Sequence, residues 1–397
     1  MPDLIVDKPK LLWQLQFEGA WPMAVAFLDS GRRIVAGNQD GQLLMWELPE
    51  EPPAFEPSKK SDRLAPSATP CRRLDGHANG ISRLVTTPDG KWIVSASLDH
   101  TLRLWDANGD PTGDAEIVVD VETRQAEAKR SRKDDALQQP GIAVKTQQAA
   151  HVFTGHQDWI EALGITDDGL RVISGDNSAH VFVWDLATRK EVSHWKGMGW
   201  NWIVAAALSP DGQTALVSEH RYKRDDFDIP STALRLWNVT DATEKLDLMK
   251  VQFPKFKPED TSYGAAQVWR KFIANGLITA SVSPDGKLLA LGQGGETDKG
   301  QVHLLDAASG TLVRSISGHQ YGVTDIRFSS DGKFILSTGR DTMLRITQVE
   351  DGKEVAALGT PRGGQFKDWL SSLAIAPDQK TVAATDIAGL IHVWSLG

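Results

Sequence analysis

One repeated pattern constrains the fold of this chain more than any other feature of its sequence. A Gly-His pair opens each copy, a Trp-Asp pair closes it, and two apolar runs split by a tight turn lie between them. Copies span Gly76–Asp106 and Gly155–Asp185, and a third, without its closing Trp, spans Gly318–Thr347. Because a unit of this size cannot bury its own apolar face, it must stack against further copies of itself.

A second marker, the turn between the first two strands of a unit, raises the count to seven. Pro presets φ, Asp caps the turn and Gly accepts a positive φ. The turns read Thr87-Pro88-Asp89-Gly90, Asp167-Asp168-Gly169, Ser209-Pro210-Asp211-Gly212, Ser283-Pro284-Asp285-Gly286 and Ser330-Asp331-Gly332, with variants at Asp29-Ser30-Gly31 and Pro377-Asp378-Gln379.

The position of the closing Trp can be followed through all seven units. It is occupied by Trp46, Trp105, Trp184, Trp237, Leu305, Thr347 and Trp394. The last two spacings, 42 and 47 residues, match the ~40–45 residues of a four-stranded propeller blade. The longer spacings indicate a blade plus an insertion.

Together these markers resemble the WD-repeat (WD40) β-propeller family over essentially the full length. The resemblance implies an all-β fold, a seven-bladed β-propeller of four-stranded antiparallel blades, in one domain over residues 1–397. The chain stops after the third strand of the seventh unit, so we expect Lys10–Leu15, within residues 1–18, to supply the missing fourth strand. That pairing would close the ring and remove two sheet edges.

In this family the His, Ser or Thr, Asp and Trp of one blade form a hydrogen-bonded tetrad. Unit 3 has Ser178 in the Asp position and Asp176 two residues earlier, and unit 6 has Thr347 in place of Trp. We therefore expect unit 2 to be the stiffest blade and the others to be held mainly by apolar packing. The tetrad of unit 2 would consist of His77, Ser95 (or Ser97), Asp99 and Trp105.

Insertions sort between the two faces of such a propeller. Loops joining strands one to two and three to four share the bottom face, and the remaining loops share the top face. The bottom-face insertions are 49–69, expected to be a tethered disordered loop, and 107–149, whose middle residues 122–139 indicate a short helix. If Glu244–Val251 is the outer strand of unit 4, the top-face insertions are 219–232, 252–275 and 294–300.

Four tryptophans share one register, just before the first strand of their units. The seven residues at this register are Trp21, Gly80, Trp159, Trp202, Gly276, Gly322 and Trp369. They would surround the top mouth of the channel, where such rings either anchor a partner or lie flat and cap the channel. Both alternatives stay open.

Further residues suited to binding a partner lie on the same face. Aromatic rings beside cations suit recognition of a peptide, although the aromatics of 252–275 could instead pin a long loop to the rim. These top-face candidates are Tyr321, Arg221, Tyr222, Arg224, Lys255 and Trp269.

Charge and composition limit the classes of partner expected for this chain. A formal net charge of -9 argues against nucleic acid and anionic membranes. The sequence shows neither a signal peptide nor an apolar run long enough to span a membrane, which favours the cytoplasm. One cysteine excludes an intramolecular disulfide. The Ser-Pro-Asp-Gly-Lys idiom is typical of a bacterial member. We expect a monomer that binds other proteins or peptides.

The family resemblance implies a non-catalytic protein–protein interaction scaffold. The alternative is a propeller enzyme, or a small-ligand or metal-binding sensor that uses the central channel. Such sites need His or carboxylate groups converging on the axis, and most of the ten His can be assigned to blade structure or strands. A catalytic role for the tetrad is disfavoured because it lies within a blade without an evident oxyanion hole. We expect no catalytic residue, metal or cofactor.

Overall fold

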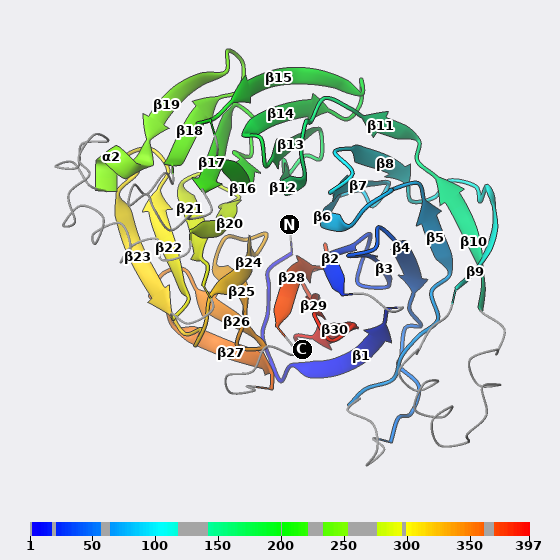
Figure 1. Cartoon of the computed structure of the whole chain (residues 1–397). Coiled ribbons are helices and arrows are strands. Elements are labelled where there is room, and N and C mark those ends of the chain that lie inside the picture. Colours follow the sequence, from blue (N-terminus) through cyan, green and yellow to red (C-terminus); the bar gives the residue numbers. More distant parts are fainter. Residues whose placement is uncertain are drawn as a thin grey trace, which may run out of the picture.

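Seven β-sheets stand around a central channel like the blades of a propeller (Figure 1). This computed structural model describes residues 2–17, 21–56, 64–117, 142–199, 201–220, 233–252, 276–295, 299–360 and 369–397. Six sheets have four strands and one has six. The prediction of an all-β, seven-bladed propeller is confirmed.

Each blade starts with an inner strand, and the seven inner strands follow one another around the channel. The inner strands of blades 1 to 7 are β2 (Pro22–Phe27), β6 (Ile81–Thr86), β12 (Ile160–Ile165), β16 (Trp202–Leu208), β20 (Leu277–Val282), β24 (Val323–Phe328) and β28 (Leu370–Ile375). The second strands are β3 (Arg33–Asn38), β7 (Trp92–Ser97), β13 (Arg171–Asp176), β17 (Thr214–His220), β21 (Leu288–Gln293), β25 (Phe334–Gly339) and β29 (Thr381–Asp386).

Each meander continues outward to the rim. The third strands are β4 (Leu43–Glu47), β8 (Leu102–Asp106), β14 (His180–Asp185), β18 (Ala233–Asn238), β22 (Gln301–Asp306), β26 (Met343–Gln348) and β30 (Leu390–Ser395). The fourth strands are β5 (Arg72–Asp75), β11 (His151–Phe153), β15 (Lys190–Lys196), β19 (Thr243–Asp247), β23 (Leu312–Ser317), β27 (Glu354–Gly359) and β1 (Lys10–Gln16).

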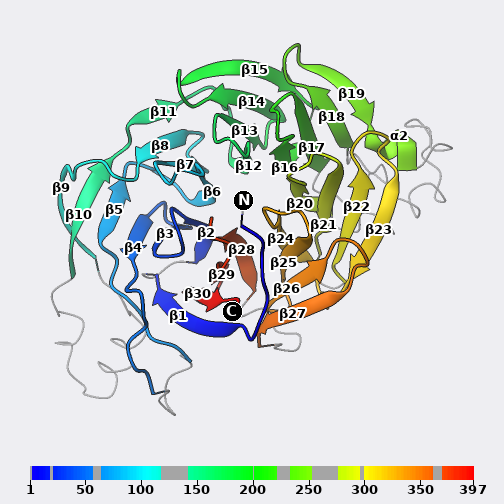
Figure 2. The ribbon, with the colours of Figure 1, turned by 180° about the vertical axis from the view of Figure 1, so that it is seen from behind.

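The first and last strands of the chain share blade 7. β1 pairs antiparallel with β30, so that Leu11 lies opposite Trp394 and Trp13 opposite Val393. The preceding residues run to β1 from near the channel (Figure 2), and the Asp7 N–H donates to the Leu396 carbonyl at 2.7 Å. The predicted closure by the N-terminal strand is confirmed, and it leaves no open gap between blades 7 and 1.

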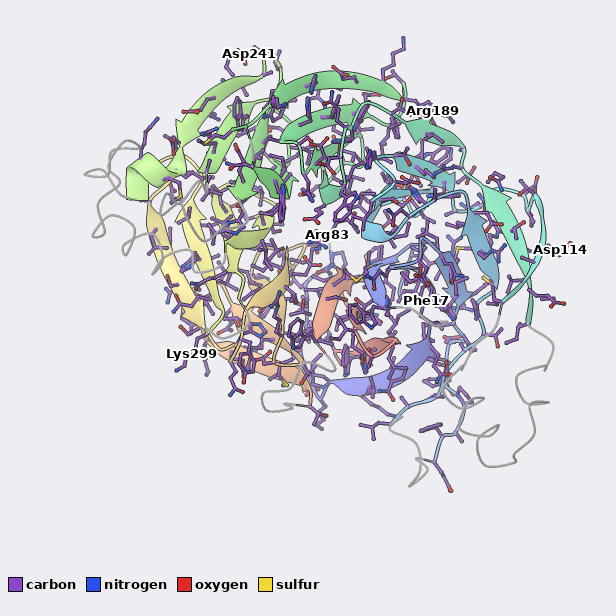
Figure 3. All side chains as sticks on the ribbon, viewed as in Figure 1. Phe17, Arg83, Asp114, Arg189, Asp241 and Lys299 are labelled. Carbon is purple, nitrogen blue, oxygen red and sulfur yellow. The ribbon has the colours of Figure 1, made fainter. Side chains whose placement is uncertain are left out.

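The 107–149 insertion lends two strands to a neighbouring blade. β9 (Gly113–Ile117) and β10 (Ile142–Gln148) form an antiparallel pair, and β10 pairs parallel with β5. The chain thus leaves blade 2 after β8, widens blade 1 to six strands and returns as β11. Asp114 of β9 lies at the outer rim, whereas Arg83 of β6 lies by the channel (Figure 3). The helix expected at 122–139 falls outside the described residues.

The fourth strand of blade 4 is shorter than the sequence predicts. The predicted strand Glu244–Val251 is wrong, because β19 ends at Asp247 and the short helix α2 (Leu248–Gln252) follows. The Asp247 carboxylate accepts the backbone N–H of Met249 at 3.0 Å, as an N-cap does. Leu248 is fully buried, so the turn into a helix keeps this apolar side chain in the core.

The hydrophobic core lies between neighbouring blades. One cluster joins Leu104 of blade 2 to Leu163 and Trp184 of blade 3, and another joins Leu15 and Val393 of the closing blade to blade 1. Each blade therefore buries its faces only against its neighbours, as a repeat of this kind requires.

Hydroxyl groups tie several inner strands to the next blade. Every inner strand has a register shift near its start, after its first residue or, in β16, after its second. At this irregularity Thr324 donates to the Leu370 carbonyl at 2.6 Å, and Ser371 donates to the Pro22 carbonyl at 2.9 Å. These bonds bring the starts of neighbouring inner strands together, and with them one mouth of the channel.

Candidate functional site

Blade 2 contains a complete hydrogen-bonded tetrad. The Trp105 indole N–H donates to the Ser95 hydroxyl at 2.9 Å, and the same hydroxyl lies 2.7 Å from His77 Nε2. His77 Nδ1 lies 2.8 Å from a carboxylate oxygen of Asp99. The chain of contacts links the second and third strands of the blade to the loop that enters it.

Blade 3 contains an equivalent tetrad, so the prediction that unit 3 departs from the tetrad is wrong. His156 lies 2.9 Å from Asp176 and 2.7 Å from Ser174, and the Trp184 indole N–H donates to Ser174 at 3.0 Å. The carboxylate stands two residues after the serine rather than four. Ser178, in the expected Asp position, instead donates to Asp158 at 3.1 Å.

Other blades keep parts of the network. In blade 6, His319 lies 2.9 Å from both Asp341 and Ser337, and Thr347 replaces the Trp. In blade 4, buried Glu219 pairs with Arg235 at 3.2 Å. Blade 7 pairs His392 with Asp386 at 2.7 Å. Buried polar contacts therefore add to the apolar packing that the sequence predicts as the main stabilising contact of these blades.

The electrostatics of the tetrads suit structure. Burial lowers the pKa of His77 despite the neighbouring carboxylate. Burial would raise the pKa of Asp99, but hydrogen bonds from His77 and Thr101 hold it well below its usual range. The pair is thus a neutral imidazole beside a carboxylate. Because the Ser95 and Ser174 side chains are 0% exposed, no substrate reaches these hydroxyls.

In six blades, the residue at the tryptophan register makes the same backbone hydrogen bond. Its carbonyl accepts the N–H of the residue that follows the second strand of its blade, at 2.8–3.0 Å. These carbonyls belong to Trp21, Gly80, Trp159, Gly276, Gly322 and Trp369. In the remaining blade, Trp202 lies opposite His220, the last residue of β17. We call this end of the inner strands the top mouth.

Two of the four tryptophans are well exposed. Trp21 is 50% exposed and Trp159 is 47% exposed, whereas Trp202, Trp369 and Tyr321 are half-buried. The Arg340 guanidinium lies 4.3 Å from the centre of the Trp369 ring, a cation–π contact within the chain. Trp21 and Trp159 are therefore the most exposed tryptophans of the top mouth.

Glycines in this register stand where a side chain has no room. A Cβ atom on Gly80 would lie 2.6 Å from the Gln39 carbonyl oxygen, and one on Gly322 would lie 2.4 Å from the Gly295 nitrogen. Gly80 belongs to blade 2, between the blades of Trp21 and Trp159. The other top-face candidates, Arg221, Tyr222, Arg224, Lys255 and Trp269, lie outside the described residues.

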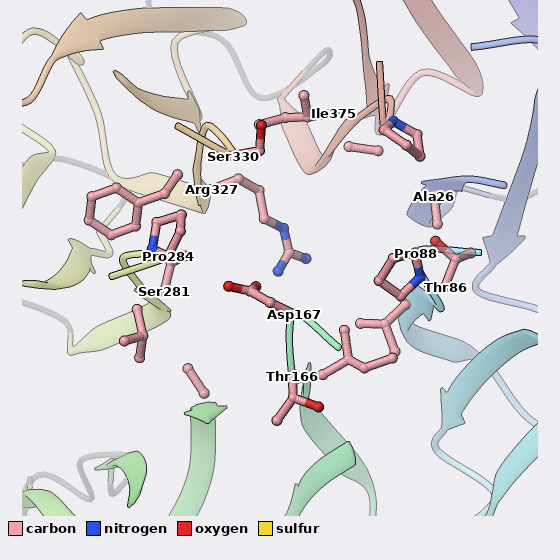
Figure 4. A pocket seen from close by; sticks show the side chains of 18 of the residues that line it. Ala26, Thr86, Pro88, Thr166, Asp167, Ser281, Pro284, Arg327, Ser330 and Ile375 are labelled. Atoms are coloured by element: carbon pink, nitrogen blue, oxygen red, sulfur yellow. The ribbon is translucent and has the colours of Figure 1, made fainter. Parts of the chain in front are cut away.

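The opposite end of the channel, the bottom mouth, holds a cavity of about 480 Å3. Its walls are the last residues of the inner strands and the turns that follow them (Figure 4). Asp167 and Arg327 enter it from blades 3 and 6. Neither residue is predicted from the sequence to bind a ligand, although both depart from the repeat. Asp167 stands where four turns carry Pro, and Arg327 stands where the other inner strands carry small or apolar residues.

In the described part of the chain, no group of three or more His, Cys, Asp or Glu side chains is arranged to hold a metal ion. Among those same residues, no helix has the length and apolar character needed to cross a membrane.

Comparison with a known family identifies the repeats. The model of the WD40 family, "WD domain, G-beta repeat", matches residues 68–106, 147–185 and 310–347. The first and third matches run from the fourth strand of one blade through the first three strands of the next, so the sequence repeat and the blade are offset by one strand. The chain thus contains WD40 repeats.

Relatives support this result. The chain is 35% identical to Autophagy-related protein 16 of Arabidopsis thaliana over 331 residues, which cover 83% of this chain and 50% of that protein. It is 22% identical to Apoptotic protease-activating factor 1 of Mus musculus over 68% of this chain and 23% of that protein. A third relative, Small ribosomal subunit protein RACK1 of Caenorhabditis elegans, is 28% identical over 26% of this chain and 30% of its own length. The chain therefore spans half the length of the plant relative and a smaller share of the other two relatives.

Proposed function

We propose that this propeller of WD40 repeats is a non-catalytic scaffold that docks a partner protein on its top mouth through Trp21 and Trp159. The observation that carries the proposal is the exposure of two large aromatic side chains at one register, 50% and 47%. Tryptophan is the residue most enriched among binding hot spots, and leaving two such rings in water is unfavourable unless they bind.

The surroundings of the two rings favour a protruding peptide segment as the partner. Gly80 places no side chain between their two blades, so a guest can approach both rings. Asp158, beside Trp159, is half-buried and accepts the Trp159 backbone N–H at 2.8 Å. A carboxylate beside an aromatic face suits an apolar or basic side chain of the guest. Trp202, Trp369 and Tyr321 would line the edge of the same site.

The other attributes proposed here follow from composition and site chemistry. A net charge of -9 favours protein over nucleic acid as partner. The buried serines of the tetrads support a scaffold rather than an enzyme. A cytoplasmic, monomeric protein remains our proposal, as does a bacterial origin, although the relatives named above are eukaryotic.

Affinity capture from the native host tests the proposal. The wild-type protein, a Trp21→Ala/Trp159→Ala variant and a Trp92→Ala variant are purified in parallel, and co-purifying proteins are identified by mass spectrometry. Trp92 is the matched control because it is a half-buried tryptophan beside the turn at the bottom mouth, near Lys91 and Arg189.

The proposal requires a partner that binds the wild type and the Trp92 variant but not the double variant. Truncating a hot-spot tryptophan typically costs about 2 kcal/mol or more, about 30-fold in affinity. A partner retained by the double variant, with both proteins folded, would exclude docking through these rings and favour the alternative that they cap the channel.

A further inference from the structure

Two opposite charges break the repeat at the bottom mouth. Asp167 occupies the position held by Pro88, Pro210, Pro284 and Pro377 in four other turns. Arg327 is the penultimate residue of its inner strand. The same place in the other six strands holds Ala26, Val85, Gly164, Ala207, Ser281 and Ala374. Neither the turn nor the strand therefore needs a charge at these places.

The two side chains point toward one another from far sides of the channel (Figure 4). They belong to blades 3 and 6, nearly opposite in a ring of seven. No ion pair joins them, and the carboxylate that pairs with Arg327 is that of Asp325, at 3.8 Å. The guanidinium and the Asp167 carboxylate therefore both face the cavity without pairing directly.

Little within the described residues satisfies the Arg327 guanidinium. Its neighbour Asp325 is committed elsewhere: one carboxylate oxygen accepts the Leu373 N–H at 2.9 Å, and the other accepts the Ile326 N–H at 2.9 Å and the Thr279 hydroxyl at 3.2 Å. A guanidinium has five N–H donors in a fork that matches a carboxylate. The remaining donors are available to an anionic group in the cavity.

Asp167 lacks a counter-charge among the described residues. It accepts no hydrogen bond from them, whereas Asp29, the only other acid at this turn position, pairs with Arg33 at 2.7 Å. Burial raises the pKa of Asp167, and the nearby Asp168 adds to the effect. A carboxylate that is exposed to the cavity yet poorly solvated favours a cationic guest.

We infer that the bottom mouth binds a small zwitterion, the chemistry of a free amino acid or a short peptide. Arg327 holds its carboxylate and Asp167 its ammonium group. The cavity of about 480 Å3 falls in the range of small-molecule sites, ~300–1,000 Å3. Val85, Leu208 and Ile375 give it apolar wall for a side chain.

This site is separate from the proposed docking surface. Trp159 directly precedes β12 and Asp167 follows it, and six extended residues span about 20 Å. The ligand inference therefore stands or falls independently of partner docking at the top mouth.

Isothermal titration of the full chain tests the inference. The probes are glycine, leucine, phenylalanine and the dipeptide Ala-Leu, each compared with its N-acetyl form, which lacks the ammonium group, and its amide, which lacks the carboxylate. The variants Asp167→Pro and Arg327→Ala restore residues that the repeat itself carries at these positions, so both are expected to fold. Trp159→Ala at the other mouth is the control.

At least one zwitterion should bind the wild type and the Trp159 variant with a Kd below about 1 mM. Its acetylated and amidated forms should bind at least tenfold more weakly, as should the zwitterion to either bottom-mouth variant. Free amino acids and dipeptides form separate arms that identify the source of the ligand. No binding by any probe, equal binding of a blocked form, or unchanged affinity in both folded variants would overturn the inference.

Discussion

The two mouths of the channel are built from opposite ends of the same seven strands, yet they carry different chemistry. The top mouth presents exposed Trp21 and Trp159. The bottom mouth is ringed by turns whose hydroxyl and carboxylate groups bond to one another, as Thr87 donates to Asp89 at 2.5 Å. Among the described residues that line its cavity, only Asp167 and Arg327 are charged. This contrast indicates that the repeat determines the propeller scaffold, whereas residues that depart from the repeat mark the candidate sites.

The change with the greatest predicted consequence opens the ring and so disrupts both mouths. Deletion of residues 1–18 takes away β1 and with it the ladder to β30, so the ring opens between blades 7 and 1. We expect aggregation or loss of the cooperative thermal transition, measured by circular dichroism and light scattering. A milder change, Leu15→Ala, should lower the free energy of unfolding by about 3 kcal/mol, since Leu15 is fully buried. A truncated chain with an unchanged melting temperature would contradict the closure.

The next effect separates the mouths. Trp21→Ala/Trp159→Ala should abolish partner capture while leaving the melting temperature within about 2 °C, because exposed side chains contribute little to stability. Conversely, Arg327→Ala should leave partner capture unchanged. Partner binding and differential scanning calorimetry on the same preparations measure both outcomes. Equal loss of partner from the two variants would mean that the mouths do not act separately.

A smaller effect tests the frame that holds the mouths in place. Ser174→Ala strands both the Trp184 N–H and His156, whereas Ser337→Ala strands only His319. We expect urea unfolding to show losses of about 2–3 and about 1–2 kcal/mol respectively, because each buried unsatisfied group costs about 1–3 kcal/mol. Two equal losses would show that the Trp contact contributes nothing, and that blade 3 gains no stability over blade 6 from its full tetrad.

The last prediction concerns how stability depends on pH. This dependence has opposite signs for the buried histidines of the tetrads and for Asp167 at the bottom mouth. Burial lowers the pKa of His77 and His156, so the unfolded chain takes up protons first and stability falls as pH drops below about 6.5. The pKa of Asp167 is raised by burial, so this carboxylate opposes folding at neutral pH and ceases to do so on acidification. Melting curves from pH 4 to 8 should show a steeper acid loss for Asp167→Pro than for wild type. The same loss of melting temperature in both proteins would show that Asp167 does not contribute to the pH dependence of stability.

The features predictable from sequence are those fixed by local chemistry or by the number of strands in each repeat. The turns around Asp89 and its counterparts follow from residues adjacent in the chain, and the closing strand at Lys10–Leu15 follows because the seventh unit ends after its third strand. The parallel pairing of β10 with β5 depends on contacts between distant segments, so nothing in the sequence near Ile142 indicates it. Likewise, the tetrad of blade 3 places Asp176 two residues from its serine, and only the fold shows that the carboxylate still reaches His156 at 2.9 Å.

The charged bottom mouth illustrates the same limit at a candidate site. Asp167 and Arg327 lie 160 residues apart in the chain, so their convergence depends on the closed ring. Comparing the units position by position does reveal each as a departure from Pro or from a small residue. The sequence therefore holds the signal for each residue but not for the pair.

The central claim, that the partner docks on the top mouth, is tested most directly by site-specific photo-crosslinking in the native host. A photo-reactive aromatic amino acid replaces Trp159 in one protein and Trp92 in another, and crosslinked proteins are identified by mass spectrometry. Docking on the top mouth predicts that a partner is crosslinked from position 159 and not from position 92. A partner crosslinked from position 92 alone would contradict it and place the docking surface at the bottom mouth.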